Sequence, residues 1–85
     1  MDEMQEGITG SVRALSAWRR ESQADLGALL GLSAVTIAQR LNGRLAWTLK
    51  DVSALCKHYG LTFDQLTKGP ASWLGLDQEV GSTPP

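Results

Sequence analysis

The spacing of apolar residues along the chain predicts five short helices and no strand. Ile8, Val12 and Leu15 lie three and four residues apart, which places them on one face of a first helix over about 8–20. The same spacing predicts four further helices: about 23–30, about 34–42, about 49–59 and a short last one carrying Phe63 and Leu66. The predicted fold class is therefore all-α.

Capping signals mark where the later helices begin and end. A Ser or Thr followed three residues later by Asp or Gln can form a capping box, and three such pairs stand at the starts of predicted helices: Ser22 with Asp25, Thr48 with Asp51, and Thr62 with Gln65. Ser33 is expected to cap the third helix, and Gly31 and Gly60 stand where a left-handed residue would end a helix. On the fourth helix the predicted buried residues are Leu49, Val52, Leu55, Cys56 and Tyr59.

Length and composition indicate one domain with a short tail, since 85 residues can build one hydrophobic core but not two. We expect an acidic N-terminal segment over 1–7, a helical domain over 8–68 that Lys68-Gly69-Pro70 closes, and a C-terminal tail over 69–85 with a disordered end. No apolar run is long enough for a membrane span, and the N terminus lacks the pattern of a secretory signal. A cytoplasmic protein without membrane contacts is expected.

Residues that carry catalytic or metal chemistry are few. One cysteine, Cys56, and one histidine, His58, provide neither an internal disulfide nor a zinc-ligand set, and His58 is expected to be a solvated surface residue. The chain offers no nucleophile with an adjacent base, no carboxylate pair in a plausible cleft and no phosphate-binding loop. We expect no enzymatic activity, no metal and no cofactor.

Charge is distributed unevenly along the chain. The formal net charge of −1 does not by itself favour a polyanion partner. All eight basic residues, however, lie between Arg13 and Lys68, and this stretch holds only four acids, which gives it a net charge of +4. The other five acids lie near the two ends of the chain. The distribution therefore permits DNA as a partner of the middle stretch.

Residues from Gln23 to Asn42 follow a helix-turn-helix pattern. Two short helices are joined by a tight turn at Gly31, and Gly27 is expected where the two helices cross. The second helix buries one narrow side through Ile37 and Leu41, which leaves an outer face of small and polar residues. A bulky residue at Gly27 or Gly31 should displace this second helix.

Residues about 12–67 resemble the phage repressor/Cro (Xre-like) family of helix-turn-helix DNA-binding domains. The resemblance is carried by Val12, Leu15, Ser22-Gln23-Ala24-Asp25-Leu26-Gly27, Leu30-Gly31-Leu32-Ser33, Thr36-Ile37, Asn42-Gly43 and Leu61-Thr62-Phe63-Asp64-Gln65-Leu66. It implies a five-helix lambda-repressor-like fold and a sequence-specific transcriptional regulator, most simply a repressor, at the nucleoid of a bacterium or in a phage. Glu21 departs from the pattern, because the family has an apolar residue there; we expect Trp18 to cover the gap.

The resemblance also implies which residues contact double-stranded DNA. The helix over about 33–42 would enter the major groove, with base readers at Ser33, Ala34, Val35, Thr36 and Gln39 and a further candidate at Arg40. The residue types suit this role, since an amide can pair with adenine, hydroxyls can bond bases, and small apolar side chains can touch thymine methyl groups. Phosphate contacts are implied for Gln23, Asn42 and Arg44. Arg19 and Arg20 are either phosphate ligands or solvated charges at a helix end.

The expected assembly is a homodimer on an inverted-repeat operator, with the two recognition helices about 34 Å apart. The apolar stretch Trp73-Leu74-Gly75-Leu76 has two open interpretations, packing against its own domain or contacting a second subunit. Trp73, Leu74 and Leu76 are therefore the candidates for a dimer contact. The alternative function is a protein-interaction module of the same fold, such as an antitoxin or adaptor, that binds a protein partner through these residues.

Overall fold

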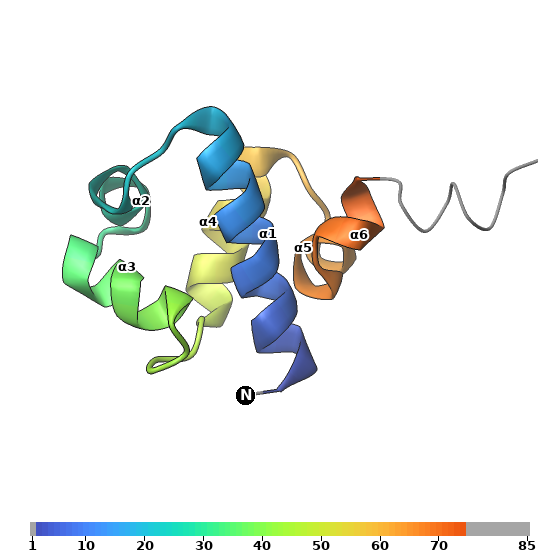
Figure 1. Ribbon diagram of the computed structural model, residues 1–85, viewed down its shortest axis with the longest axis horizontal. Helices are drawn as coiled ribbons and strands as arrows, with labels where there is room; N and C mark the ends of the chain where they lie inside the picture. Colours follow the sequence, from blue (N-terminus) through green and yellow to red (C-terminus); the bar gives the residue numbers. More distant parts are fainter. Residues whose placement is uncertain (1, 75–85) are drawn as a thin grey trace, which may run out of the picture.

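The computed structural model describes residues 2–74, and the regular secondary structure in that part of the chain is all helical (Figure 1). The helices are α1 (Glu3–Arg19), α2 (Gln23–Leu30), α3 (Ala34–Leu41), α4 (Leu49–Tyr59), α5 (Phe63–Lys68) and α6 (Pro70–Trp73). The predicted all-α fold is confirmed over this range, but the number of five helices is wrong because the tail adds α6. None of these helices has both the length and the apolar character needed to cross a bilayer.

The first helix begins at Glu3, five residues before the predicted start. The Asp2 side chain caps it by accepting a hydrogen bond of 2.8 Å from the Gln5 N–H, and Glu3 and Glu6 occupy the first turn. Acids are favourable at this end of a helix because the free N–H groups carry partial positive charge. The acidic residues set apart over 1–7 therefore include the first turn of α1, and the predicted start near residue 8 is wrong.

The bounds of the middle helices agree with the sequence pattern. Helices α2 and α4 span the predicted residues, and α3 ends at Leu41, one residue early. All three predicted capping boxes are formed, and Ser33 caps α3. Gly31 and Gly60 adopt left-handed conformations with φ of 72° and 70°. These boundaries could be predicted because each depends on residues within one turn of the helix end.

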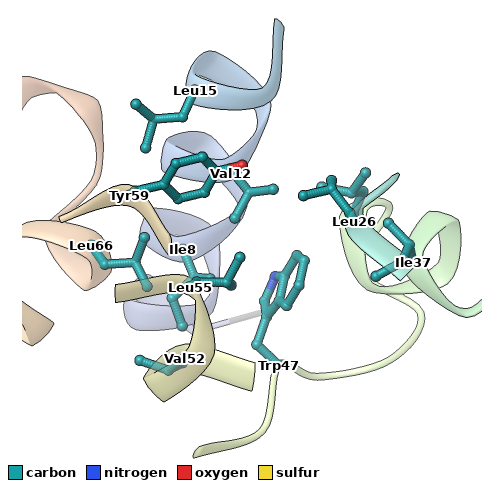
Figure 2. Packing of buried hydrophobic residues seen from close by; sticks show 11 residues of the cluster. Ile8, Val12, Leu15, Leu26, Ile37, Trp47, Val52, Leu55, Tyr59 and Leu66 are labelled. Carbon is teal, nitrogen blue, oxygen red and sulfur yellow. The ribbon is translucent and has the colours of Figure 1, made fainter. Parts of the chain in front are cut away.

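The core forms around α1, which runs between two groups of helices. Helices α2 and α3 lie on one side of it, and α5 and α6 lie on the other (Figure 1). Ile8 and Val12 of α1 are almost completely buried, and Figure 2 shows them beside Leu55 of α4 and near Leu66 of α5. Ile37 of α3 is also fully buried. Helix α3 is therefore attached to the same core as the rest of the domain.

Trp47, in the loop between α3 and α4, is part of this core and is held by α1. Its indole is 4% exposed and donates a hydrogen bond of 2.9 Å from Nε1 to Thr9 Oγ1. Its backbone N–H donates to Gln5 Oε1 at 2.6 Å, and its carbonyl accepts from Gln5 Nε2 at 3.1 Å. The side-chain amide of Gln5 thus binds both the N–H and the carbonyl of Trp47, as a backbone peptide group in a β-sheet would. This pairing fixes the loop that follows α3.

The chain folds back after α5, so Lys68-Gly69-Pro70 does not close the domain. Trp73 packs partly buried against the core, and its Nε1 donates to Ser11 Oγ at 2.8 Å. The Ser11 hydroxyl in turn donates to the Leu66 carbonyl at 3.0 Å. Of the two interpretations of the apolar tail residues, packing against the same domain is correct for Trp73, whereas Leu74 is 54% exposed. Leu76 lies outside the described residues.

Three expected environments around the core are wrong. Trp18 is 79% exposed and covers no gap, because Glu21 binds side chains of α4 instead of leaving a space. Leu49 is 76% exposed, since it is the first residue of α4 and the buried residues of this helix begin at Asp51. His58 is half-buried through its pairing with Glu21.

The close approach of α1 to α5 predicts that Gly7→Ala destabilises the domain. A Cβ atom at Gly7 would lie 1.8 Å from the Thr67 carbonyl oxygen, which is backbone and cannot turn aside. We expect a loss of about 2–3 kcal/mol in the free energy of unfolding, measured by urea denaturation followed by circular dichroism.

Gly10→Ala is the matched control for this substitution in the same helix. Its Cβ atom would meet only the Pro70 ring, with the nearest atom at 3.1 Å. The gain in helix propensity of about 1 kcal/mol should offset this contact, so stability should change little. Equal losses in the two variants would contradict the assignment of Gly7 as the point of closest approach.

Candidate nucleic-acid interface

Helices α2 and α3 form the predicted helix-turn-helix unit, and Gly27 sets the distance between α2 and the turn. A Cβ atom at Gly27 would lie 2.3 Å from the Leu32 carbonyl oxygen. The Leu32 N–H donates to the Gly27 carbonyl at 2.8 Å, which closes the turn. Gly31 has open space around it and is needed for its left-handed φ of 72°, so its role is conformational and not steric.

The outer face of α3 presents small apolar and polar groups. Ser33 caps the helix by accepting from the Thr36 N–H at 3.1 Å, and its hydroxyl lies 3.0 Å from Thr36 Oγ1. Because Ser33 donates in that contact, the hydroxyl proton of Thr36 is free to donate outward. Val35 is 68% exposed, and no hydrogen bond among residues 2–74 uses the half-buried Gln39 amide. This face offers both hydrogen-bonding groups and methyl groups to a ligand.

The side chain of Arg40 is used within the fold. Its Nε lies 3.0 Å from Asp51 Oδ2, with the two side chains 12% and 5% exposed, and Nη1 donates to the Ala46 carbonyl. The Nε contact is an ion pair without the alignment of a hydrogen bond. This arrangement connects the last turn of α3 to the first turn of α4 and to the loop between them. It favours a structural role for Arg40 over base reading.

Arg13 of α1 holds the same end of α3, and sequence reasoning missed it. Its Nη2 donates to the Leu41 carbonyl at 2.9 Å. Leu41 is the last residue of α3, where carbonyl groups lack helical partners and carry partial negative charge. No sequence signal distinguishes Arg13 from the other exposed arginines of the first helix, and only the packing of α1 on α3 identifies its target.

The predicted phosphate ligands divide into two groups. Asn42 and Arg44 are exposed just after α3, where Asn42 Oδ1 accepts from the Arg44 N–H at 3.1 Å and the Gln39 carbonyl accepts from the same N–H at 2.9 Å. Gln23 is exposed at the first position of α2. These three residues lie at the ends of the helix-turn-helix unit, where their side chains can reach a flanking backbone.

The arginines at the end of α1 are arranged differently. Arg19 Nη1 donates to the His58 carbonyl at 3.2 Å, and its guanidinium lies 5.0 Å from the centre of the Tyr59 ring. Arg20 is exposed and has a left-handed φ of 60° at the end of the helix. Arg19 therefore has a structural role on α4, while Arg20 keeps its side chain available to solvent.

Glu21 anchors the start of α2 to α4. Its Oε1 accepts from the Tyr59 hydroxyl at 2.6 Å, and its Oε2 lies 2.5 Å from His58 Nε2. Burial, followed by the hydrogen bond to Glu21, raises the pKa of Tyr59 well above its usual range, so Tyr59 remains a donor. A carboxylate with two partners thus connects the start of α2 to the end of α4.

Negative charge within the helix-turn-helix unit is confined to the start of α2. Helix α3 contains no acidic residue, and Asp25, the one acid of α2, is occupied as a cap. Hydrogen bonding with Ser22, first through its backbone N–H, which donates to Asp25 Oδ2 at 2.8 Å, and then through its side chain, lowers the pKa of the Asp25 carboxyl below its usual range. A phosphate therefore meets no carboxylate on α3, whereas the ionised Asp25 lies two residues from Gln23 at the start of α2.

The contacts of Arg40 and Arg44 predict that only the substitution of Arg40 lowers the stability of the domain strongly. Arg40→Met leaves the buried Asp51 carboxylate without its cation, so we expect a loss of about 3 kcal/mol in the free energy of unfolding. Arg44→Met removes an exposed side chain and should change stability by less than about 0.5 kcal/mol. Urea denaturation of both variants measures this difference. Unchanged stability in Arg40→Met, together with altered base preference, would instead support base reading by Arg40.

The model of the BetR domain matches residues 8–84, which is most of the chain. No curated protein and no solved structure gave a match. The matched range includes the helix-turn-helix unit and both groups of predicted phosphate ligands. The chain belongs to the BetR domain family, a helix-turn-helix-like family of DNA-binding domains.

Proposed function

We propose that this protein is a sequence-specific transcriptional regulator that reads the major groove of DNA with α3. The observation that carries the proposal is the outer face of α3, which presents Thr36, Val35 and Gln39 without an acidic residue on the helix. The family supports DNA as the partner. An exposed valine is unfavourable in water, but it suits contact with a thymine methyl group.

The residues around α3 divide into base readers and phosphate ligands. Gln39, Thr36 and Ser33 would supply most of the discrimination, with Ala34 and Val35 in apolar contact. Gln23, Asn42, Arg44 and Arg20 would bind phosphates and supply most of the affinity. Arg40 and Arg13 would act indirectly, by holding the C-terminal end of α3 against the domain.

Repression through a homodimer is the most economical mechanism. Two copies of α3 in successive major grooves on one face of DNA lie about 34 Å apart, which matches an inverted repeat. The resemblance of residues about 12–67 to phage repressor/Cro proteins supports this arrangement and a role in blocking RNA polymerase.

A second candidate function is a protein-interaction module. An apolar groove of about 510 Å³, here called the Trp18 groove, is lined by Trp18, Arg19, Tyr59, Trp73 and Leu74 among others. Trp18 and Leu74 are 79% and 54% exposed, which favours a protein ligand at this groove. The polar face of α3 is not explained by this function, so DNA binding remains the proposal.

The test is selection of duplexes from a random library, followed by fluorescence-anisotropy titration of the selected and a scrambled duplex between about 50 and 200 mM salt. We expect a selected inverted repeat and a steep fall of affinity with salt. The absence of any enriched sequence, with equal binding to both duplexes, would overturn the assignment as a sequence-specific regulator.

Two substitutions separate the roles on a single half-site duplex. Gln39→Ala should relax the preference at one base pair and cost about 1–3 kcal/mol per half-site. Arg44→Ala should weaken all duplexes by a similar factor and lower the salt slope by about 1. Lys68→Ala is the charge control, because Lys68 lies on α5, across α1 from α3 (Figure 1). An unchanged base preference in Gln39→Ala would exclude Gln39 as a base reader.

A further inference from the structure

Three exposed apolar side chains lie together on the part of the domain formed by α1, α4 and α5. Met4, Leu49 and Phe63 are 48%, 76% and 44% exposed, and each comes from the first turn of its helix. None of them belongs to the helix-turn-helix unit. We call this surface the Phe63 face, since Phe63 is common to the two hollows described next. Its apolar side chains have no partner within the described part of the chain that would remove them from water.

Two shallow hollows of similar size meet at Phe63. The first, of about 430 Å³, is lined by Glu3, Met4, Phe63, Asp64, Thr67 and Lys68. The second, of about 420 Å³, is lined by Leu49, Val52, Ser53, Cys56, Lys57 and Phe63. The ring of Phe63 therefore borders both hollows, with Met4 in one and Leu49 in the other.

The two hollows carry opposite charge. The first holds two exposed carboxylates, Glu3 and Asp64, against one lysine, and the second holds Lys57 and no acid. A two-fold axis close to Phe63 places the first hollow of one copy against the second hollow of the other. Such an isologous contact pairs residue i of one copy with residue j of the other, and j with i. Lys57 of each copy therefore faces the carboxylates of the other copy, and this pairing occurs twice in the dimer. The face is complementary to itself in charge.

We propose that the Phe63 face is the homodimer interface, with a second copy of this chain as its occupant. Phe63 packs near the axis, Met4 and Leu49 of opposite copies approach each other, and Lys57 of each copy pairs with Asp64 and Glu3 of the other. This proposal rests on the proposed function, because it supplies the dimer that an inverted repeat requires. It assigns the dimer contact to α1, α4 and α5 and not to Trp73 and Leu74.

The position of the face agrees with simultaneous DNA binding. Helix α5 lies on the opposite side of α1 from α3, so a contact at α5 leaves the outer face of α3 uncovered in both copies (Figure 1). The Trp18 groove suits a second copy less well. Its lining includes Arg19 and no acid, so a two-fold contact there would bring like charges together.

Sedimentation equilibrium of the full chain without DNA tests the interface, up to a protein concentration of about 1 mM. Leu49→Glu places a charge on the face, and Trp18→Glu is the matched control, because both residues are about equally exposed. We expect the dimer dissociation constant to rise at least about tenfold in Leu49→Glu and to stay within about twofold in Trp18→Glu. Loss of the dimer in Trp18→Glu alone would overturn the proposal and favour the Trp18 groove.

Charge exchange tests the predicted pairing more sharply. Lys57→Glu and Asp64→Lys should each weaken the dimer, by about three- to tenfold, and the double variant should recover most of the wild-type affinity. Circular dichroism of each variant confirms that the helices are intact. A double variant that is no tighter than either single variant would contradict the two-fold pairing, as would a wild-type chain that stays monomeric at the highest concentration.

Cys56 provides an independent readout within the second hollow. The thiol is half-buried, and burial raises its pKa, so it reacts slowly with a thiol reagent such as DTNB even in the monomer. Its reaction rate should fall further as protein concentration rises through the dissociation constant, and this dependence should disappear in Leu49→Glu. A rate that is independent of concentration in a dimeric wild-type chain would place the interface elsewhere.

The outcomes for the dimer and for DNA binding are separable. A dimer through the Phe63 face without sequence-specific DNA binding would retain this inference and refute the proposed function. Binding of one half-site by a monomeric wild-type chain, with normal base preference, would retain the function and refute the interface. Half-site titration of Leu49→Glu therefore accompanies the sedimentation measurement, and its half-site affinity should equal that of the wild type.

Discussion

The anchoring of α3 is the constraint on which the rest of the structure depends. A helix of eight residues is too short to be stable alone in water, so it must obtain its stability from packing. Only Ile37 and Leu41 of α3 are buried. Polar contacts at its C-terminal end complete the attachment, from Arg13 to the Leu41 carbonyl and from Arg40 to Asp51. This division keeps apolar contacts on the inner side and leaves the outer side free to vary for recognition.

Local signals made much of the fold predictable from the sequence. Capping boxes and left-handed glycines act within a single turn, so the bounds of α2 and α4 follow from residues such as Ser22, Thr48 and Gly60. The start of α1 was missed because Asp2 and the following acids have a composition that is also typical of a disordered segment. The burial of Trp73 was left open because its partner Ser11 is distant in sequence.

The candidate site could be predicted only in part, for a similar reason. The position of α3 and its outer residues follow from helical spacing, so the placement of Ser33, Val35 and Gln39 away from the core could be predicted. The direction of a long side chain does not follow from spacing. Arg40 could equally reach a base or a carboxylate, and the placement of Asp51 by the cap of α4 decides between them. The direction of the Glu21 side chain could not be predicted either, since its partners come from α4.

Helix α1 connects the DNA-binding face to the Phe63 face without a hinge. Gly7 contacts the end of α5 so closely that a Cβ atom has no room, and Arg13, two turns later, binds the end of α3. Because both contacts belong to one continuous helix, α3 and α5 keep a fixed relative position. In a two-fold dimer the separation of the recognition helices is twice their distance from the axis, so a flexible connection would double any error. In the proposed dimer, the close contact at Gly7 and the bond from Arg13 would together hold the two copies of α3 at a defined spacing.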